Sequence, residues 1–159
     1  IVKQVREFRI PLVELTGGEP LLQPAAPELA RELLDANLQV LIETGGHRDI
    51  SSLDPRCHII LDVKTPGSGM QAYTDFENLA RLGDGDELKL VCADRADYEW
   101  SRDLLRERQL EGRFPIHLSP VHGELDPAEL SAWVLEDGLQ VRLNLQLHKY
   151  IWGSDASGV

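Results

Sequence analysis

Two glycines and an acidic residue follow the first apolar segment of the chain. Residues 11–15 (PLVEL) have the apolar, β-branched character of a short buried strand, and residues 16–20 (TGGEP) come directly after it. Adjacent glycines allow a sharp turn or the close approach of a ligand to the backbone. The carboxylate of Glu19 and the nearby carbonyls could accept hydrogen bonds from an ammonium group. The alternative is an ordinary loop after a strand, because short glycine motifs also occur by chance.

Polar residues also come at the ends of the later predicted strands. They are Thr16, Gly18 and Glu19; Glu43 and Thr44; Asp62 and Lys64; Lys89; Ser119 and His122; and Gln146, His148 and Lys149. A parallel barrel places the carboxyl ends of its strands on one rim, where catalytic groups gather. A single charged residue at a strand end is usually a solvated cap, whereas recurrence favours a shared site. Asp62 and Lys64 suit a zwitterionic or carboxylate ligand, or a surface ion pair of little energetic value.

Cysteine and histidine spacing predicts no metal site. The two cysteines, Cys57 and Cys92, form no CxxC pair, and Cys92 closes a predicted strand, where we expect it in the core. The five histidines show neither HxH nor HExxH spacing. We interpret His58 and His117 as structural and His148 as a candidate functional residue. No side chain is assignable as catalytic from these patterns.

Strand-like and helical segments alternate along the chain. The predicted strands are residues 11–15, 39–43, 58–63, 86–92, 115–119 and 140–147, and the first ten residues resemble the approach to a strand. The predicted helices are residues 27–38, 75–82, 94–110 and a segment beginning at Asp126-Pro127, with residues 47–57 irregular or briefly helical. This order predicts an α/β fold with a mostly parallel, curved sheet and helices outside. With no repeat or linker, we expect one domain over residues 1–152 and a poorly ordered tail, residues 153–159.

Apolar spacing predicts which faces of these elements are buried. In residues 94–110, the side chains of Ala96, Trp100 and Leu104 fall on one helical face. In residues 140–147 (QVRLNLQL), apolar and polar residues alternate strictly, which is typical of a strand with one buried face.

Composition excludes some classes of function. The 159 residues suit a compact domain, and the net charge of −11 argues against nucleic-acid binding, which needs a basic face. No apolar run approaches the roughly 18 residues of a membrane helix, and no signal peptide is visible. Two cysteines without a disulfide pattern indicate a cytoplasmic protein.

Several segments resemble those of one enzyme family. Residues 16–20 resemble the GGEP motif of radical S-adenosylmethionine (SAM) enzymes, where this loop hydrogen-bonds the amino group of the SAM methionine. Four further segments are similar to those of 7-carboxy-7-deazaguanine synthase: residues 41–46 (LIETGG), 61–70 (LDVKTPGSGM), 119–121 (SPV) and 147–150 (LHKY). Their order and approximate spacing agree with that family over most of the chain.

The resemblance implies a partial (β/α) barrel of the radical SAM type and a carbon–nitrogen lyase of queuosine and deazapurine biosynthesis. Its cofactors would be SAM, a 4Fe–4S cluster and Mg²⁺. A deoxyadenosyl radical would abstract hydrogen from 6-carboxy-5,6,7,8-tetrahydropterin, and ring contraction with loss of ammonia would give 7-carboxy-7-deazaguanine. Flavodoxin or ferredoxin would be the reductant, and assembly as a homodimer stays open.

The resemblance also implies roles for individual residues. The SAM-binding residues would be Gly18, Glu19, Thr44, Asp62, Val63, Lys64, Ser119 and Pro120, and the substrate-binding residues Thr16 and His148. The family's three-cysteine cluster motif and metal-binding threonine precede the glycine loop, so this segment would contain no metal ligand. We expect an amino-terminal segment to be absent from the sequence and this segment to be inactive without its cluster. The alternatives are another radical SAM enzyme, such as an organic-radical-activating enzyme, and a non-catalytic SAM-pocket remnant.

Overall fold

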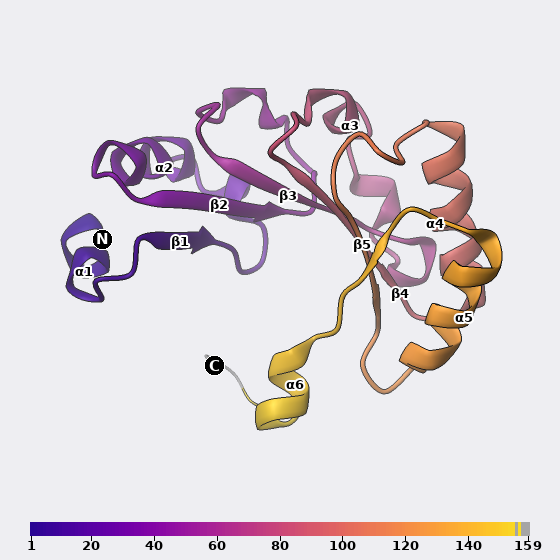
Figure 1. The fold of residues 1–159 in the computed structure, drawn as a ribbon. Helices are drawn as coiled ribbons and strands as arrows, with labels where there is room; N and C mark the ends of the chain where they lie inside the picture. Colours follow the sequence, from indigo (N-terminus) through magenta and orange to yellow (C-terminus); the bar gives the residue numbers. More distant parts are fainter. Residues whose placement is uncertain (155, 157–159) are drawn as a thin grey trace. The chain divides into compact units, whose positions relative to one another are not determined.

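The computed structural model describes residues 1–154 and 156, which fall into two compact units (Figure 1). Unit 1 contains Ile1–Asp62 and Tyr73–Glu87, and unit 2 contains Val63–Ala72 and the chain from Leu88 onward. Within the described part of the chain, every helix is too short or too polar to cross a membrane.

Unit 1 is built around parallel strands. The strands β1 (Leu12–Leu15), β2 (Gln39–Thr44) and β3 (His58–Val63) pair in parallel, with β2 in the middle. The helices are α1 (Val2–Glu7), α2 (Ala26–Asp35) and α3 (Asn78–Arg81). Helix α2 lies alongside β2 and buries Ala30 and Leu33 completely (Figure 1). This packing fixes the carboxyl ends of β1 and β2 next to each other.

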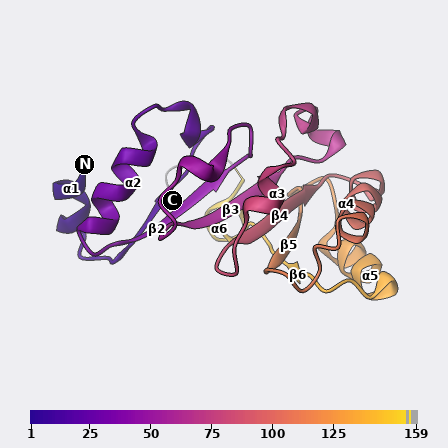
Figure 2. The same cartoon turned by 90° about the horizontal axis from the view of Figure 1, so that it is seen from above.

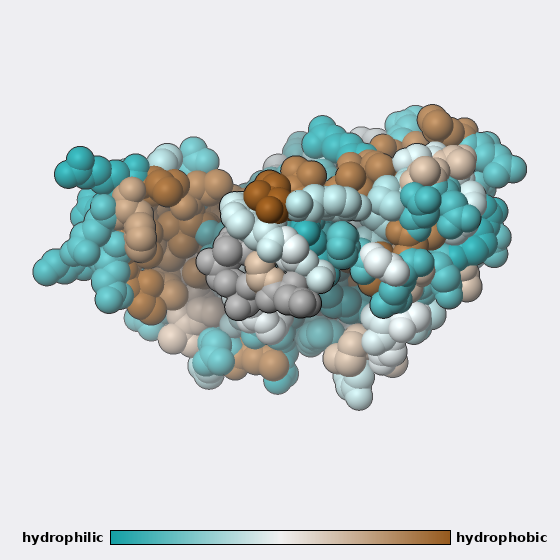
Figure 3. All heavy atoms as spheres, turned by 90° about the horizontal axis from the view of Figure 1, so that it is seen from below, coloured by the Kyte–Doolittle hydropathy of each residue, from teal (hydrophilic) through white to brown (hydrophobic). Residues whose placement is uncertain are grey.

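The first strand is not buried, so that part of the prediction is wrong. Leu12 is 46% exposed, and β1 pairs with β2 along one edge, with no second partner strand among the described residues. Figure 3 shows apolar surface gathered over the amino-terminal elements of this unit. The first ten residues do lead to a strand, and Val2–Glu7 forms α1 before β1 begins. The apolar, β-branched residues thus predicted the strand correctly, but they did not predict whether it is buried. Burial depends on the neighbouring elements.

Unit 2 repeats the parallel arrangement. Its strands β4 (Glu87–Cys92), β5 (Ile116–Pro120) and β6 (Arg142–Leu143) pair in parallel, with β5 in the middle. Its helices are α4 (Arg95–Glu107), α5 (Pro127–Asp137) and α6 (Leu147–Trp152). Helices α4 and α5 lie side by side in both ribbon views (Figures 1 and 2), and Tyr98 packs on Trp133 with ring centroids 5.4 Å apart. Parallel strands with accompanying helices in both units confirm the predicted α/β class.

Short 3₁₀ turns complete the connections. They are η1 (Pro20–Leu22), η2 (Ile50–Ser52), η3 (Pro66–Ser68) and η4 (Gln71–Tyr73). The turn at Ile50–Ser52 matches the expectation that residues 47–57 are irregular or briefly helical.

The buried face of α4 differs from the predicted one. Ala96 is exposed, Trp100 is half-buried, and the buried residues are Asp97, Tyr98, Ser101, Leu104 and Leu105. The Tyr98 hydroxyl lies 2.8 Å from the Trp133 carbonyl and 2.7 Å from Asp137 Oδ2, so its single proton has two acceptors within hydrogen-bonding distance. A buried tyrosine that satisfies its hydroxyl in this way turns the helix toward α5, which apolar periodicity alone did not indicate.

The predicted strand over residues 140–147 is mostly wrong. Only Arg142–Leu143 is a strand, and Leu143 and Leu147 are 41% and 61% exposed. The register pairs β6 with β5 on one side, and the next turn of chain starts α6 at Leu147. His148 therefore lies in a helix and not at a strand end. Within the predicted tail, residues 155 and 157–159 lie outside the described residues.

Candidate functional site

The glycine loop after β1 lines an open cavity in unit 1. Thr16, Gly17 and Gly18 are exposed and border a cavity of about 760 Å³, together with residues of α2. Gly17 and Gly18 have φ of 90° and 58°, and an added Cβ would meet nothing within 4 Å at either position. Both glycines are required by backbone conformation, and their peptide groups are accessible to a ligand.

Glu19 holds this loop against the end of β2. Its side chain is only 6% exposed, and it accepts hydrogen bonds from the Thr44 hydroxyl at 2.7 Å and the Gly45 amide at 2.9 Å. The Leu21 amide donates to the same carboxylate at 3.0 Å, so Glu19 also caps the η1 turn. We call Glu19, Leu21, Thr44 and Gly45 the Glu19 cluster. The structure thus brings Glu19 and Thr44 together, and the Glu19 carboxylate accepts hydrogen bonds from donors of the protein itself.

His47 borders the Glu19 cluster, although sequence analysis gave it no role. Its Nδ1 lies 3.5 Å from Glu19 Oε2, and its ring meets the edge of Tyr73, with centroids 6.2 Å apart. Asn78, which is fully buried, ties down the same loop by accepting from the Ile50 amide and donating to the carbonyls of Gly46 and Arg48. The segment after β2 is therefore fixed from two sides.

Asp62, Val63 and Lys64 close β3 and pass into the loop that follows it. Asp62 and Val63 are buried at 7% and 0% exposure, and Lys64 is half-buried. In unit 2, the hydroxyl of Thr65 donates to the carbonyl of Val91 at 2.9 Å, and this bond ties the loop to β4. Of the residues from Asp62 to Thr65, only Lys64 has partial access to solvent.

Asp97 is a further buried carboxylate, in the first turn of α4, which follows the end of β4. It is 2% exposed and accepts from the Gly67 amide at 2.8 Å and the Ala93 amide at 3.0 Å. We call Asp97, Gly67 and Ala93 the Asp97 cluster. The sequence offered only a general signal for it, an acidic residue in the first turn of a helix, which suits the helix dipole.

Ser119, Pro120 and His148 belong to unit 2. Ser119 and Pro120 end β5 and are buried, and the Ser119 hydroxyl has no hydrogen-bond partner within the described residues. In the loop after β5, His122 packs edge-on against Tyr150 of α6, with ring centroids 5.0 Å apart. This contact places α6, and with it the exposed His148, next to the loop after β5. A buried hydroxyl without a partner is a polar group that a ligand could satisfy.

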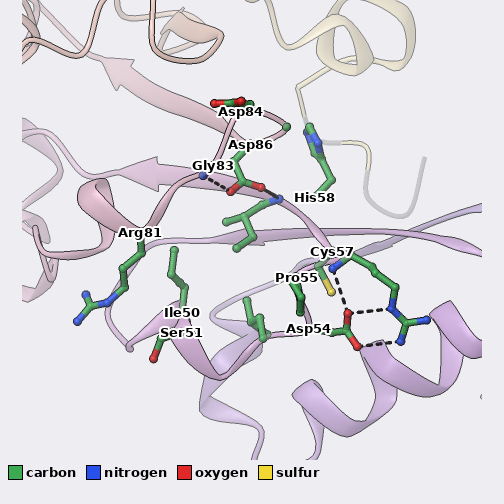
Figure 4. A pocket seen from close by; sticks show the side chains of 14 residues that line it. Ile50, Ser51, Asp54, Pro55, Cys57, His58, Arg81, Gly83, Asp84 and Asp86 are labelled. Atoms are coloured by element: carbon green, nitrogen blue, oxygen red, sulfur yellow. Dashed lines mark hydrogen bonds and ion pairs between the residues drawn. The ribbon is translucent and has the colours of Figure 1, made fainter.

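A further cavity of unit 1, of about 570 Å³, lies before β3 and β4 (Figure 4). Asp86 accepts from the amides of Gly83 and Ile59, both at 2.8 Å, and Asp54 is held by Arg56 at 2.8 Å. These carboxylates are already satisfied by the protein, and the cavity lies at the amino ends of the strands. We therefore assign the candidate site to the carboxyl ends.

The two cysteines are inert by burial. Cys92 is fully buried, as predicted, and burial raises the pKa of its thiol to about 12. Cys57 is 8% exposed, and burial likewise raises its pKa above the usual value. Among residues 1–154 and 156, no group of three histidine, cysteine or acidic side chains could hold a metal ion.

Comparison with known proteins gives concordant results at the level of sequence and of fold. No model of a protein family matches the chain. It is 43% identical over 162 residues to a 7-carboxy-7-deazaguanine synthase from Chlorobaculum tepidum, a match that covers 100% of this chain and 74% of that protein. It is 42% identical over 163 residues to a 7-carboxy-7-deazaguanine synthase from Koribacter versatilis, covering 93% and 72%.

The fold is similar to the crystal structure of QueE from Escherichia coli, with a TM-score of 0.68 and 19% identity. This match covers 90% of this chain and 60% of that chain, and it supports the predicted fold. The two sequence matches confirm the resemblance seen in the motifs, and the chain belongs to the 7-carboxy-7-deazaguanine synthase family.

Proposed function

We propose that this chain binds SAM and 6-carboxy-5,6,7,8-tetrahydropterin for the formation of 7-carboxy-7-deazaguanine, the activity for which its relatives are named. The protein would be a radical SAM carbon–nitrogen lyase of queuosine biosynthesis. The observation that carries the proposal is the glycine loop: Gly17 and Gly18 are exposed beside a cavity, while Glu19 fixes the loop from behind.

The chemistry of the donors and acceptors fits SAM. In unit 1, the peptide groups around Gly18 would hold the ammonium group of the methionine, and Thr16 would contact substrate. Glu19 and Thr44 would shape the loop, since they bond to each other, and Asp62 lies at the end of β3 in this unit. In unit 2, the adenine would contact Ser119 and Pro120, supported by the Ser119 hydroxyl, which has no hydrogen-bond partner in the described part of the chain.

Three further residues of unit 2 would contact the ligands. Val63 and Lys64 would contribute to the SAM site, because they close β3 where the loop held by Thr65 begins. His148 would contact the substrate from α6. The contribution of this chain is to bind and orient the two reactants, since hydrogen abstraction tolerates little misplacement.

The described residues do not fit the 4Fe–4S cluster, whose chemistry is the transfer of an electron to SAM. Cluster ligands are thiolates, and burial raises the pKa values of both Cys57 and Cys92. Among the described residues, no group of three histidine, cysteine or acidic side chains could hold a metal ion. These residues therefore offer no such group for Mg²⁺ either. We therefore assign no step through either group to these residues. A cytoplasmic location, flavodoxin or ferredoxin as reductant, and a homodimer belong to the same proposal.

Calorimetric titration of the chain with SAM tests the proposal, using Gly18→Val as the variant. We expect micromolar-range binding by the unmodified chain and at least about tenfold weaker binding by Gly18→Val, since a branched side chain blocks the approach to the loop. Gly138→Val is the matched control, because Gly138 also has a positive φ, 64°, and open space around it.

Two results would contradict the proposal. Equal SAM affinity of Gly18→Val and the unmodified chain would refute the loop assignment. SAM binding without any binding of the carboxy-tetrahydropterin would favour another radical SAM enzyme or a SAM-binding remnant.

A further inference from the structure

The loop after β3 is hydrogen-bonded to a buried carboxylate on α4. Asp97 accepts a hydrogen bond from the Gly67 amide of this loop at 2.8 Å and another from the Ala93 amide, in the segment after β4, at 3.0 Å. Asp97 is 2% exposed, so its side chain has little contact with water. Charge-assisted hydrogen bonds of this kind are stronger than neutral ones.

The packing at Gly67 leaves no room for a side chain. An added Cβ would lie 2.6 Å from Asp97 Oδ2 and 3.0 Å from Oδ1. Gly67 does not have a left-handed φ, so its glycine serves the close approach to the carboxylate and not an unusual backbone conformation. The loop backbone therefore lies directly on Asp97.

Other hydrogen bonds preserve the shape of the loop without replacing this contact. The Ser68 hydroxyl donates to the Thr65 carbonyl at 2.6 Å and accepts from the Met70 amide at 3.1 Å. Thr65 bonds to Val91 of β4. The loop is thus attached to the neighbouring segments at Thr65 and at Gly67, and Asp97 supplies the second attachment.

The helix that carries Asp97 is itself firmly placed. The Asp97 amide donates to the side chain of Asp94, the N-cap of α4, at 2.9 Å. The next residue, Tyr98, is fully buried and bonded to Asp137. A carboxylate on such a helix can define the position of a loop, because its own position does not depend on that loop.

We propose that Asp97 is a positioning residue, which holds the 64–69 loop in the shape that presents Lys64 to SAM. This inference rests on the proposed function for the role of the loop. It goes beyond it by assigning a functional task to a helix residue that is not among the proposed SAM- and substrate-binding residues.

Asp97→Asn tests the inference in the full chain. Asparagine keeps the size of the side chain but replaces one acceptor oxygen with an NH₂ group, which cannot accept from an amide. Asp103→Asn is the control, because Asp103 lies on the same helix with a 54% exposed side chain. The measurements are amide hydrogen exchange at Gly67 and Ala93, the unfolding midpoint, and SAM affinity by calorimetry under conditions where each variant is folded.

We expect Asp97→Asn to accelerate exchange at Gly67 or Ala93 and to weaken SAM binding about tenfold, the scale of one charge-assisted hydrogen bond. Asp103→Asn should change neither. A purely structural role would lower the unfolding midpoint but leave the SAM affinity of the folded variant unchanged, and that result would overturn the inference. Unchanged exchange at both amides would overturn it as well.

A second variant covers the case in which Asp97→Asn does not fold. Gly67→Ala disturbs the same contact from the loop side, with Gly85→Ala as its control, since an added Cβ at Gly85 meets nothing within 4 Å. Unchanged SAM affinity of the folded Gly67→Ala variant, or unchanged exchange at both amides, would again overturn the inference. If the unmodified chain binds no SAM, the proposed function fails for this chain, and exchange at Gly67 still decides whether Asp97 holds the loop.

Discussion

The two units solve the same structural problem with carboxylates in different settings. In unit 1, Glu19 belongs to the loop that it holds and caps the turn that begins at Pro20. In unit 2, Asp97 belongs to a helix of 13 residues and holds a loop that is distant in sequence. The Glu19 cluster therefore depends on its own hydrogen bonds, whereas Asp97 is positioned independently by helix packing.

This difference has a physical consequence. Removal of Glu19 leaves three donors without an acceptor and also removes the cap of its own turn. Removal of Asp97 leaves two amides without an acceptor, but α4 keeps its Asp94 cap and its buried face. Glu19 both holds its loop in place and stabilises the local backbone conformation of that loop. Asp97 holds a loop, while the conformation of its own helix is stabilised by other residues.

The largest expected effect is that of Glu19→Ala. We expect a loss of about 3 kcal/mol in the free energy of unfolding, because buried donors lose a charged acceptor. Asp97→Ala should cost less, about 2 kcal/mol, since fewer donors are affected. Urea denaturation measures both, with the exposed Glu32→Ala as control. A larger loss for Asp97→Ala than for Glu19→Ala would contradict the comparison.

A smaller effect is expected at Thr44, which links the Glu19 cluster to the next turn. Its hydroxyl donates to Glu19 and accepts from the Gly46 amide at 3.1 Å, and the residue is 1% exposed. Thr44→Val should cost about 1.5 kcal/mol, because both groups lose a partner without a change in size. Thr44→Ser keeps the hydroxyl and should restore most of the loss. Equal losses for valine and serine in thermal or urea unfolding would show that methyl packing, not the hydroxyl, matters there.

The smallest effect is expected at Tyr98, which anchors the helix that carries Asp97. Tyr98→Phe should cost about 1 kcal/mol at pH 7, the scale of a buried hydrogen bond. The Tyr98 hydroxyl is the main cause that lowers the pKa of Asp137, and Arg102 contributes.

The same variant predicts a pH dependence. A lowered pKa contributes stability above the unfolded-state value of about 4, and this stability is lost as the pH falls through the folded-state value. The difference between the unmodified chain and Tyr98→Phe should therefore shrink as the pH falls below about 4. Urea titrations at neutral and acidic pH measure it, and a difference that grows on acidification would contradict the assignment.

Local sequence signals determined much of the architecture. Asp126-Pro127 begins α5 with the Asp126 side chain bonded to the Ala128 amide, as the capping pattern predicts. The glycine pair at residues 17–18 adopts positive φ at both positions. The short motifs around these glycines and around Asp62 and Lys64 sufficed to indicate the family. These features depend on neighbours in the chain, so the sequence carries them directly.

Tertiary structure alone decided which carboxylates hold the loops and which faces are covered. Thr44 and Gly45 donate to Glu19, and Gly67 donates to Asp97, from 25 to 30 positions away in the sequence, so no local pattern identifies these contacts. The alternation of apolar and polar residues from Val141 to Leu147 predicted a strand. This pattern reports only on the side chains, whereas a strand also needs a neighbouring strand for its backbone hydrogen bonds. Strand β5 provides that partner at Arg142 and Leu143 and, through the Leu118 carbonyl, for the Asn144 amide, and the chain then satisfies its backbone within α6.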